Sequence, residues 1–334
     1  MTPSPPLHRC WDSEDFEDTW QIPHSVCWQS EKMDVPRSLQ KMWTLKHGAP
    51  VTATALSSFL RHAFTCGRDG VKVWSLVGQV VERGSLESHL CVQNPGALVR
   101  TSHLLSDNTA LLMAGNSLAG VSVWDLKAPT LHMKSTLPCS GLSCQTLASS
   151  LLDTLALGGF SDGTIRIWDF RQKQRVRDLS NTHGAATRLL VKEQQVWAGS
   201  LEGTLQCWDL RNPSEPQKYQ LDSQIMGLSP HPHENFILVG LGNGQQWLQP
   251  TSGDLKQMVG CRENTILDLA FSPRGHWWLS VGMDRLVSIH SMPEGRACLQ
   301  VPESTGIMCC DVAQNDRLII TGSYDSATVY QVLY

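Results

Sequence analysis

A short unit recurs along the chain and ends, in its best copies, with tryptophan followed by aspartate. The clearest copy is the segment Gly158–Asp169, which reads GGFSDGTIRIWD. Other copies, some of them weaker, contain or end at Trp74, Trp124, Trp208, Trp247, His290 and Tyr330. A fixed repeat of this kind indicates one supersecondary unit that stacks on neighbouring copies of itself. The repeat therefore limits the possible folds more than any other feature of the sequence.

Each unit has the pattern of a β-hairpin. The Asp162-Gly163 pair supplies the positive φ that a tight turn between two strands needs. After the turn, Ile165 and Ile167 alternate with Arg166, which places apolar groups on one face of a sheet and the cation on the other. The units contain little that indicates a long amphipathic helix. The sequence predicts an all-β protein.

The repeat period predicts a ring of blades. The units recur about every 43 residues, which is within the range of propeller blades that have four strands and a Trp-Asp signature. Seven units predict seven blades. The segment Lys41–Leu45 is strand-like and precedes the first inner strand, Val51–Leu56, whereas little chain follows Tyr330. We expect Lys41–Leu45 to close the last blade, which gives a propeller over residues 41–334 and a separate tail over residues 1–40.

The charges are concentrated in the tail. The chain has a net charge of −4, and residues 1–40 hold seven acids and three bases, so the remainder is neutral. A neutral body argues against dedicated binding of nucleic acid or of an anionic membrane. The acidic tail is expected to be largely disordered. Its aromatic residues Trp11, Phe16 and Trp20 lie among five acids, so the tail is either a docking segment for a basic, apolar groove or a solubilising extension.

The residues that carry chemistry do not form a recognisable catalytic pattern. None of the eleven cysteines forms a C-x-x-C pair, which favours reduced thiols in an intracellular protein. The glycine-rich stretch 240–244 lies at a blade hairpin and is not followed by a helical pattern, so it does not predict a dinucleotide site. His231 and His233 lack nearby cysteines for a metal site. No signal peptide or membrane span is evident. We expect no enzyme activity, no cofactor and no metal.

Several segments resemble a known family. Three Trp-Asp pairs are typical of WD-repeat propellers, and more specific matches resemble the transducin-like enhancer (Groucho) corepressors over residues 41–334. These matches are Leu45–Gly48, Arg61–His62, Val71–Trp74, Ser122–Pro129, Ser223–Ile225 and Ala327–Val332. The resemblance implies structural roles for the blade tryptophans Trp74, Trp124, Trp168 and Trp208, with their ring nitrogens in hydrogen-bond networks within the blades.

The departures from the family point to one branch of it. Trp74 is followed by Ser75 rather than aspartate, the fifth blade is eroded, and Trp277-Trp278 is unusual. With the aromatic and acidic tail, these features resemble the divergent sixth branch, which is associated with the subcortical maternal complex of oocytes and early embryos. The resemblance implies a cytoplasmic, subcortical scaffold held by a KH-domain protein and a leucine-rich NLR-type protein. The tail has no coiled-coil heptads, so a family-type tetramer is not expected.

The resemblance also implies a binding site at the central pore, where the family captures short repressor peptides. The family positions fall on Pro50, Thr52, Leu98, Arg100, Leu267 and Met308. Arg100 and Leu267 match the family, whereas Leu98 replaces tyrosine, Pro50 replaces valine and Met308 replaces leucine. The alternative function is therefore a nuclear corepressor adaptor that binds repressor peptides of transcription factors. A basic run, Arg171–Arg177, is either a solvated loop or a contact for an acidic partner at the rim.

Overall fold

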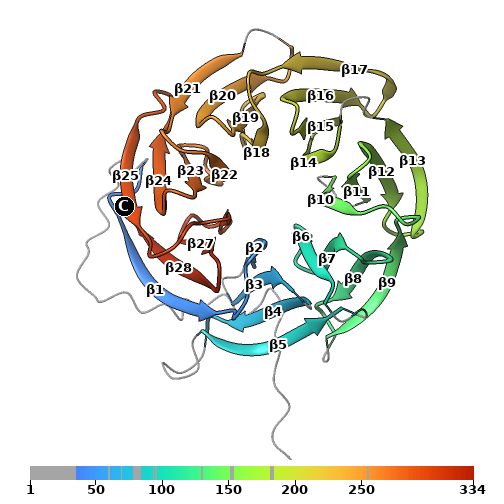
Figure 1. Cartoon of the computed structure of the whole chain (residues 1–334), viewed down its shortest axis with the longest axis horizontal. Helices are drawn as coiled ribbons and strands as arrows, with labels where there is room; N and C mark the ends of the chain where they lie inside the picture. The colour runs from blue at the N-terminus through green and yellow to red at the C-terminus, as the bar shows by residue number, and fades with distance from the viewer. Residues whose placement is uncertain are drawn as a thin grey trace, which may run out of the picture.

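The computed structural model is a ring of seven four-stranded antiparallel sheets around a central opening (Figure 1). The structure describes residues 35–334 except 59–60, 69, 78–83, 93, 95, 129–130, 151–153, 181–183, 254–255 and the side chains of 213–214. In this part of the chain every regular element is a β-strand. The predicted all-β, seven-bladed propeller is confirmed.

Each blade consists of four strands that follow one another outward from the centre. Blade 1 contains β2 (Ala53–Leu56), β3 (His62–Gly67), β4 (Gly70–Ser75) and β5 (Ser85–Cys91). Blade 2 contains β6 (Leu98–Leu104), β7 (Ala110–Asn116), β8 (Gly120–Asp125) and β9 (His132–Pro138). Blade 3 contains β10 (Cys144–Ser149), β11 (Leu155–Phe160), β12 (Thr164–Asp169) and β13 (Gln174–Ser180). Blade 4 contains β14 (Ala186–Lys192), β15 (Gln195–Ser200), β16 (Thr204–Asp209) and β17 (Asn212–Gln220).

The remaining blades complete the ring. Blade 5 contains β18 (Ile225–Pro230), β19 (Phe236–Leu241), β20 (Gln245–Pro250) and β21 (Gln257–Cys261). Blade 6 contains β22 (Ile266–Phe271), β23 (Trp277–Gly282), β24 (Leu286–Ser291) and β25 (Ala297–Pro302). Blade 7 contains β26 (Cys309–Val312), β27 (Leu318–Gly322) and β28 (Ser326–Leu333), and its outer strand is β1 (Ser38–Lys46).

The strand β1 closes the ring, as the sequence predicts. It pairs antiparallel with β28 along the whole strand, from Ser38 opposite Leu333 to Lys46 opposite Ser326. Leu45 is 1% exposed and packs into the core between blades 7 and 1. The strand begins at Ser38 rather than at Lys41, because the backbone pairing extends further toward the N-terminus than the apolar pattern indicated. Joining the two ends of the chain in one sheet removes the free edge that blade 7 would otherwise expose.

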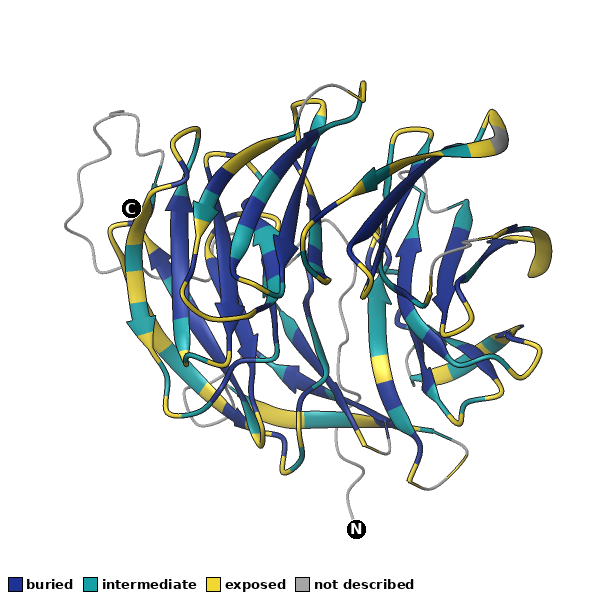
Figure 2. Ribbon diagram, turned by 45° about the horizontal axis from the view of Figure 1, so that its top comes forward, coloured by how far each residue is buried: buried dark blue, intermediate teal, exposed yellow. Residues whose placement is uncertain are grey.

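The core is divided among the junctions between blades. The described residues form seven apolar clusters, one at each junction, and each draws residues from the two neighbouring blades. Figure 2 shows buried residues concentrated on the middle strands of the blades and exposed residues on the outer strands and turns. The hairpin glycines Gly163 and Gly203 have φ of 88° and 79°, the conformation for which their turns need glycine. Burial between blades therefore holds the ring together as a single unit.

The network expected for the ring nitrogens of the blade tryptophans forms at Trp74, and His290 and Tyr330 make comparable polar contacts in blades 6 and 7. In blade 1 the indole of Trp74 donates to Thr65 Oγ1 (2.8 Å), which also bonds the His47 ring (2.8 Å). In blade 6 His290 bonds Ser280, and in blade 7 Tyr330 donates to Glu303 (2.9 Å), which also accepts a bond from Thr321. Thr65, Ser280 and Thr321 occupy the same register on the second strand of their blades. A hydroxyl at this position links the aromatic residue, directly or through Glu303, to the loop that precedes the blade.

In blades 2 and 3 the expectation for the tryptophan nitrogens is wrong. The Nε1 atoms of Trp124 and Trp168 are buried and have no hydrogen-bond partner among the described residues. The register that carries Thr65 in blade 1 holds Met113 in blade 2 and Gly158 in blade 3, and neither side chain has a hydroxyl. Trp168 and Trp208 are still almost fully buried, so their rings contribute by packing.

Blade 5 also differs from the sequence-based assignment. The predicted blade residue Trp247 pairs with Val239, whereas the residue in the register of the blade tryptophans is Gln249, opposite Ile237. Gln249 is buried, and Trp247 lies half-buried beneath the Lys256 ammonium, 5.2 Å from its ring centroid. The degenerate copy of the repeat therefore keeps its four strands but not its aromatic anchor.

Candidate functional site

Seven side chains at the entrance of the inner strands surround one end of the central opening. Each inner strand starts from a fully buried residue, and the next residue is partly or fully exposed. All inner strands run in the same direction, because each blade repeats the same up-and-down order, so these residues share one end of the pore (Figure 1). We call them the pore ring: Thr52, Arg100, Gln145, Thr187, Met226, Leu267 and Met308. Four of the six residues inferred for the pore belong to this ring.

The other two inferred residues precede the ring register. Pro50 is exposed directly before the buried Val51, and Leu98 is half-buried directly before Val99. Leu98 pairs with Asn116 of the next strand and bridges Arg68 of blade 1. Both residues lie where the chain enters the inner strands, so they can contribute to the border of the pore.

Thr52 is occupied by a structural contact. Its Oγ1 donates to the carbonyl of Val99 in blade 2 at 2.5 Å and lies 3.3 Å from the carbonyl of Cys66. Thr187 makes the equivalent bonds in blade 4, to the carbonyls of Gly199 and of Ile225 in blade 5. The hydroxyl at this register therefore ties one blade to the next, and the Thr52 hydroxyl is already engaged by backbone carbonyls.

Sequence reasoning missed Arg188, which lies on β14 directly after the ring. Its guanidinium donates to the carbonyls of Met226 (2.5 Å) and Leu267 (2.7 Å) and is 3.9 Å from the carboxylate of Asp268. Asp268 in turn accepts the backbone N–H of Cys310 at 3.1 Å. These contacts connect blades 4 to 7 across their inner strands. No motif distinguishes Arg188 in the sequence, because its partners are mainly backbone carbonyls of other blades.

Burial raises the pKa of two carboxyl groups on the inner strands. Burial raises the pKa of Asp311 to about 7, although its carboxylate accepts the backbone N–H groups of Leu56 (2.8 Å) and Val312 (2.9 Å). Burial also raises the pKa of Asp268, and the nearby Arg188 partly opposes that rise. Asp311 joins blade 7 to blade 1 as Asp268 joins blade 6 to blade 7. Both groups act as connectors between blades.

Arg100 differs from Arg188 in having no such contacts. Its side chain is exposed, and no hydrogen bond or ion pair holds it among the described residues. Blades 5, 6 and 7 contribute the apolar ring members Met226, Leu267 and Met308. The ring thus combines one available cation with an apolar arc, an arrangement that suits a short peptide with apolar side chains and an oxygen acceptor.

The comparisons with known proteins agree with this architecture. A model of the WD domain, G-beta repeat, matches residues 254–291 and 296–328. The human transducin-like enhancer protein 6 is 50% identical over 97% of this chain and 57% of its own length. The mouse transducin-like enhancer protein 2 is 32% identical over 90% of this chain and 39% of its own length. The fruit-fly (Drosophila melanogaster) protein groucho is 31% identical over 90% of this chain and 41% of its own length.

This chain belongs to the transducin-like enhancer (Groucho) family. Its identity with transducin-like enhancer protein 6 is well above its identity with the other two relatives, as expected for the divergent branch. The chain spans about half the length of the curated relatives that it matches.

Other inferred residues have different outcomes. The tail residues Trp11, Phe16 and Trp20 lie outside the described residues. The basic run falls on the turn before β13 and on β13 itself, the outer strand of blade 3. Among the described residues, no group of three or more His, Cys, Asp or Glu side chains is arranged to hold a metal ion, and no helix could span a membrane. All nine cysteines in this part of the chain are free thiols.

Proposed function

We propose that this propeller is a non-catalytic scaffold subunit of a multiprotein assembly of the subcortical maternal complex type in oocytes and early embryos. The observation that carries the proposal is the high identity with transducin-like enhancer protein 6 over nearly the whole chain. By the resemblance described above, the proposed partners are a KH-domain protein and a leucine-rich NLR-type protein. The proposed localisation is cytoplasmic and subcortical.

The structure supports a scaffold in two ways. The seven junction clusters and the contacts of Arg188, Asp268 and Asp311 hold the blades as one body, so loops of different blades keep fixed relative positions. Such a ring can bind several partners at once on its two faces and its rim. A rigid surface also loses little conformational entropy when a partner binds.

A corepressor adaptor is the second candidate. Arg100 is retained and available, and the apolar arc of Met226, Leu267 and Met308 faces it across the ring. Leu98, however, lacks the flat ring and the hydroxyl of tyrosine, and Pro50 lacks a backbone donor. These two replacements weaken the peptide site that the family uses and favour the scaffold.

The scaffold proposal is tested in native extracts. Size-exclusion chromatography and immunoprecipitation of the endogenous protein from oocytes should place it in a large assembly together with a KH-domain and a leucine-rich NLR-type protein. A protein that elutes as a lone monomer from every tissue that expresses it contradicts the proposal.

The adaptor function is tested by peptide titration of the full chain. Fluorescence polarisation with a labelled Trp-Arg-Pro-Trp peptide, compared with Arg100→Ala, measures whether the pore binds repressor peptides. If it does, Arg100→Ala should weaken binding by roughly 1–3 kcal/mol, the cost of losing a charged hydrogen bond. Arg171→Ala, an exposed arginine in a turn of blade 3, is the matched control. No binding up to near-millimolar peptide excludes the adaptor function.

A further inference from the structure

The outer strand of blade 3 is exposed in an unusual way. The first four residues of β13, Gln174–Arg177, are all exposed, and only Leu179 near its end is buried. Among the six outer strands whose burial is described throughout, β13 alone begins with four consecutive exposed residues. A bulge opposite Ile167 and Trp168 leaves Val176 without a partner on β12, and Arg175, Val176 and Arg177 are all exposed.

This exposed segment carries a local excess of positive charge. Its exposed cations are Arg171, Lys173, Arg175 and Arg177. The one acidic residue of the strand, Asp178, forms an ion pair with the nearly buried Arg166, whose Nε and Nη2 each lie 3.0 Å from a carboxylate oxygen. Arg175 makes a longer contact with Asp178 (3.4 Å), whereas no acid pairs with Arg171, Lys173 or Arg177 in the described part of the chain.

The second nearby acid is also engaged. Asp169 Oδ1 accepts the backbone N–H groups of Arg171 and Gln172, both at 2.8 Å, and so stabilises the turn that presents the cations. Residues 41–334 are neutral as a whole, so this cluster is not part of a generally basic surface. The cations are therefore held on an ordered turn and strand with most of their charge available.

The backbone of β13 is available as well. The strand pairs with β12 on one side and forms the edge of its sheet on the other (Figure 1). An edge strand presents N–H and C=O groups that can pair with an added strand. Leu179 in the core and the Arg166–Asp178 pair anchor β13 to the blade, so its edge is a fixed template.

We propose that β13 and the turn before it bind an extended acidic segment of a partner protein, which adds as a fifth strand to blade 3. The charge of the strand selects an acidic segment, and the exposed Val176 selects one that contains apolar residues between its acids. Nucleic acid is a poorer fit, because a polyanion gains affinity from a broad basic surface and the body of this protein is neutral. The site is separate from the pore ring and stands whether or not the pore binds peptides.

The test uses the full chain and a fluorescent twelve-residue peptide rich in glutamate and valine. A peptide with glutamine in place of glutamate is the control ligand. We expect the acidic peptide to bind, and we expect Arg175→Glu/Arg177→Glu to weaken it at least tenfold. Arg211→Glu, in the corresponding turn of blade 4, should leave binding unchanged, and circular dichroism should show that both variants remain folded. Binding should weaken when salt is raised, because the contacts lie at the surface.

Four outcomes overturn the proposal. The first is that the acidic peptide fails to bind or binds no better than the glutamine peptide. The second is that the double substitution has no larger effect than Arg211→Glu. The third is that a single-stranded DNA dodecamer binds more tightly than the peptide and is lost in the same variant, which assigns the strand to nucleic acid. The fourth is that a peptide copying residues 8–22 of this chain binds more tightly and is lost in that variant, which assigns the strand to the protein's own acidic segment.

Discussion

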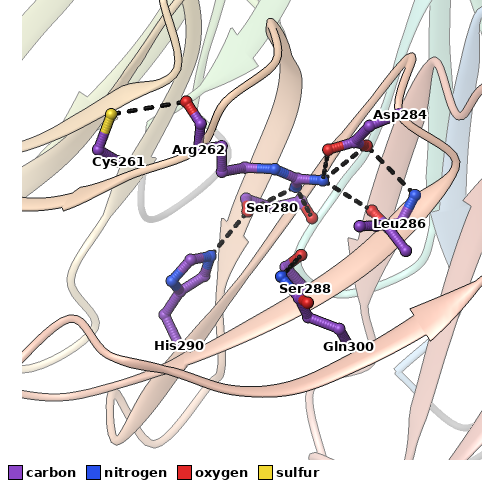
Figure 3. A network of polar contacts seen from close by, with 8 residues as sticks. All are labelled: Cys261, Arg262, Ser280, Asp284, Leu286, Ser288, His290 and Gln300. Carbon is purple, nitrogen blue, oxygen red and sulfur yellow. Dashed lines mark hydrogen bonds and ion pairs between the residues drawn. The ribbon is translucent and has the colours of Figure 1, made fainter.

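Replacing Arg262 with methionine removes the centre of a buried polar network in blade 6 (Figure 3). The guanidinium donates to both carboxylate oxygens of Asp284 (2.7 and 2.6 Å), to the carbonyl (2.6 Å) and hydroxyl (2.8 Å) of Ser280, and to the carbonyl of Leu286 (3.0 Å). The Ser280 hydroxyl also forms a hydrogen bond with the ring of His290, which is stacked on Trp278. The network therefore joins the loop before blade 6 to two of its strands.

The expected loss of stability follows from what the substitution leaves behind. The side chains of Arg262 and Asp284 are only 5% and 11% exposed, so Arg262→Met leaves a nearly buried carboxylate without its cation. Removing one partner of a buried ion pair costs about 3–5 kcal/mol. At about 2 °C per kcal/mol for a chain of this size, the melting temperature should fall by roughly 6–10 °C. Arg262→Met/Asp284→Asn removes the orphaned charge and should recover part of this loss.

Arg211 provides a control with similar geometry and different burial. Arg211 and Asp209 approach to 2.6 Å, the same distance as Arg262 and Asp284, but the Arg211 side chain is 72% exposed. Differential scanning fluorimetry of the full chain should show a large decrease for Arg262→Met and no measurable change for Arg211→Met. Equal changes in the two variants, or a double variant less stable than Arg262→Met, would refute the reasoning from burial.

Two further predictions concern the closing strand and the response to acid. Leu45→Ala leaves a cavity between blades 7 and 1 and should lower the free energy of unfolding, measured by urea titration, by about 2–5 kcal/mol. Thr44 is exposed, so Thr44→Ala should change this free energy little. Similar values for the two variants would show that β1 does not hold the ring closed. Burial lowers the pKa of His290 from 6.5 to about 4, so between these pH values the unfolded chain binds a proton that the folded chain does not. This residue should therefore cost about 3 kcal/mol of stability as pH falls from 7 to 4. That loss should disappear in His290→Gln, and unfolding curves with the same pH dependence in both proteins would contradict the assignment.

The hairpins that build the blades were predictable from the sequence, because the residues that specify a hairpin lie close together in the chain. Asp162-Gly163 and the alternation of Ile165 with Arg166 specify a turn and a strand within a few residues. The pairing of β1 with β28 was also predictable, because an unpaired strand at one end of the chain and an incomplete blade at the other leave little alternative. The hydrogen-bond networks of the aromatic blade residues were only partly predictable. Whether a ring nitrogen finds a partner depends on a residue of another strand, a hydroxyl in blade 1 and a glycine in blade 3.

For the pore too, the sequence indicated which residues take part but not which contacts they make. The resemblance to the family indicated Arg100, Leu267 and Met308, but it did not show that the Thr52 hydroxyl is bound to Val99 or that Arg188 spans to the carbonyls of blades 5 and 6. Likewise, the basic run was evident in the sequence, whereas its place on an edge strand, with Asp178 already paired to Arg166, was not.

By itself, the sequence determined the strands, their turns, the number of blades and the family, since these depend on local residue patterns and on similarity along the chain. The tertiary structure alone decided which polar groups are satisfied and which remain available. Arg188 and Arg262 lie in the same kind of sequence as Arg100 and Arg177, but hydrogen bonds to residues far apart in the chain hold the first two in place, whereas the other two are exposed. Availability for binding depends on those long-range contacts, which no local pattern encodes.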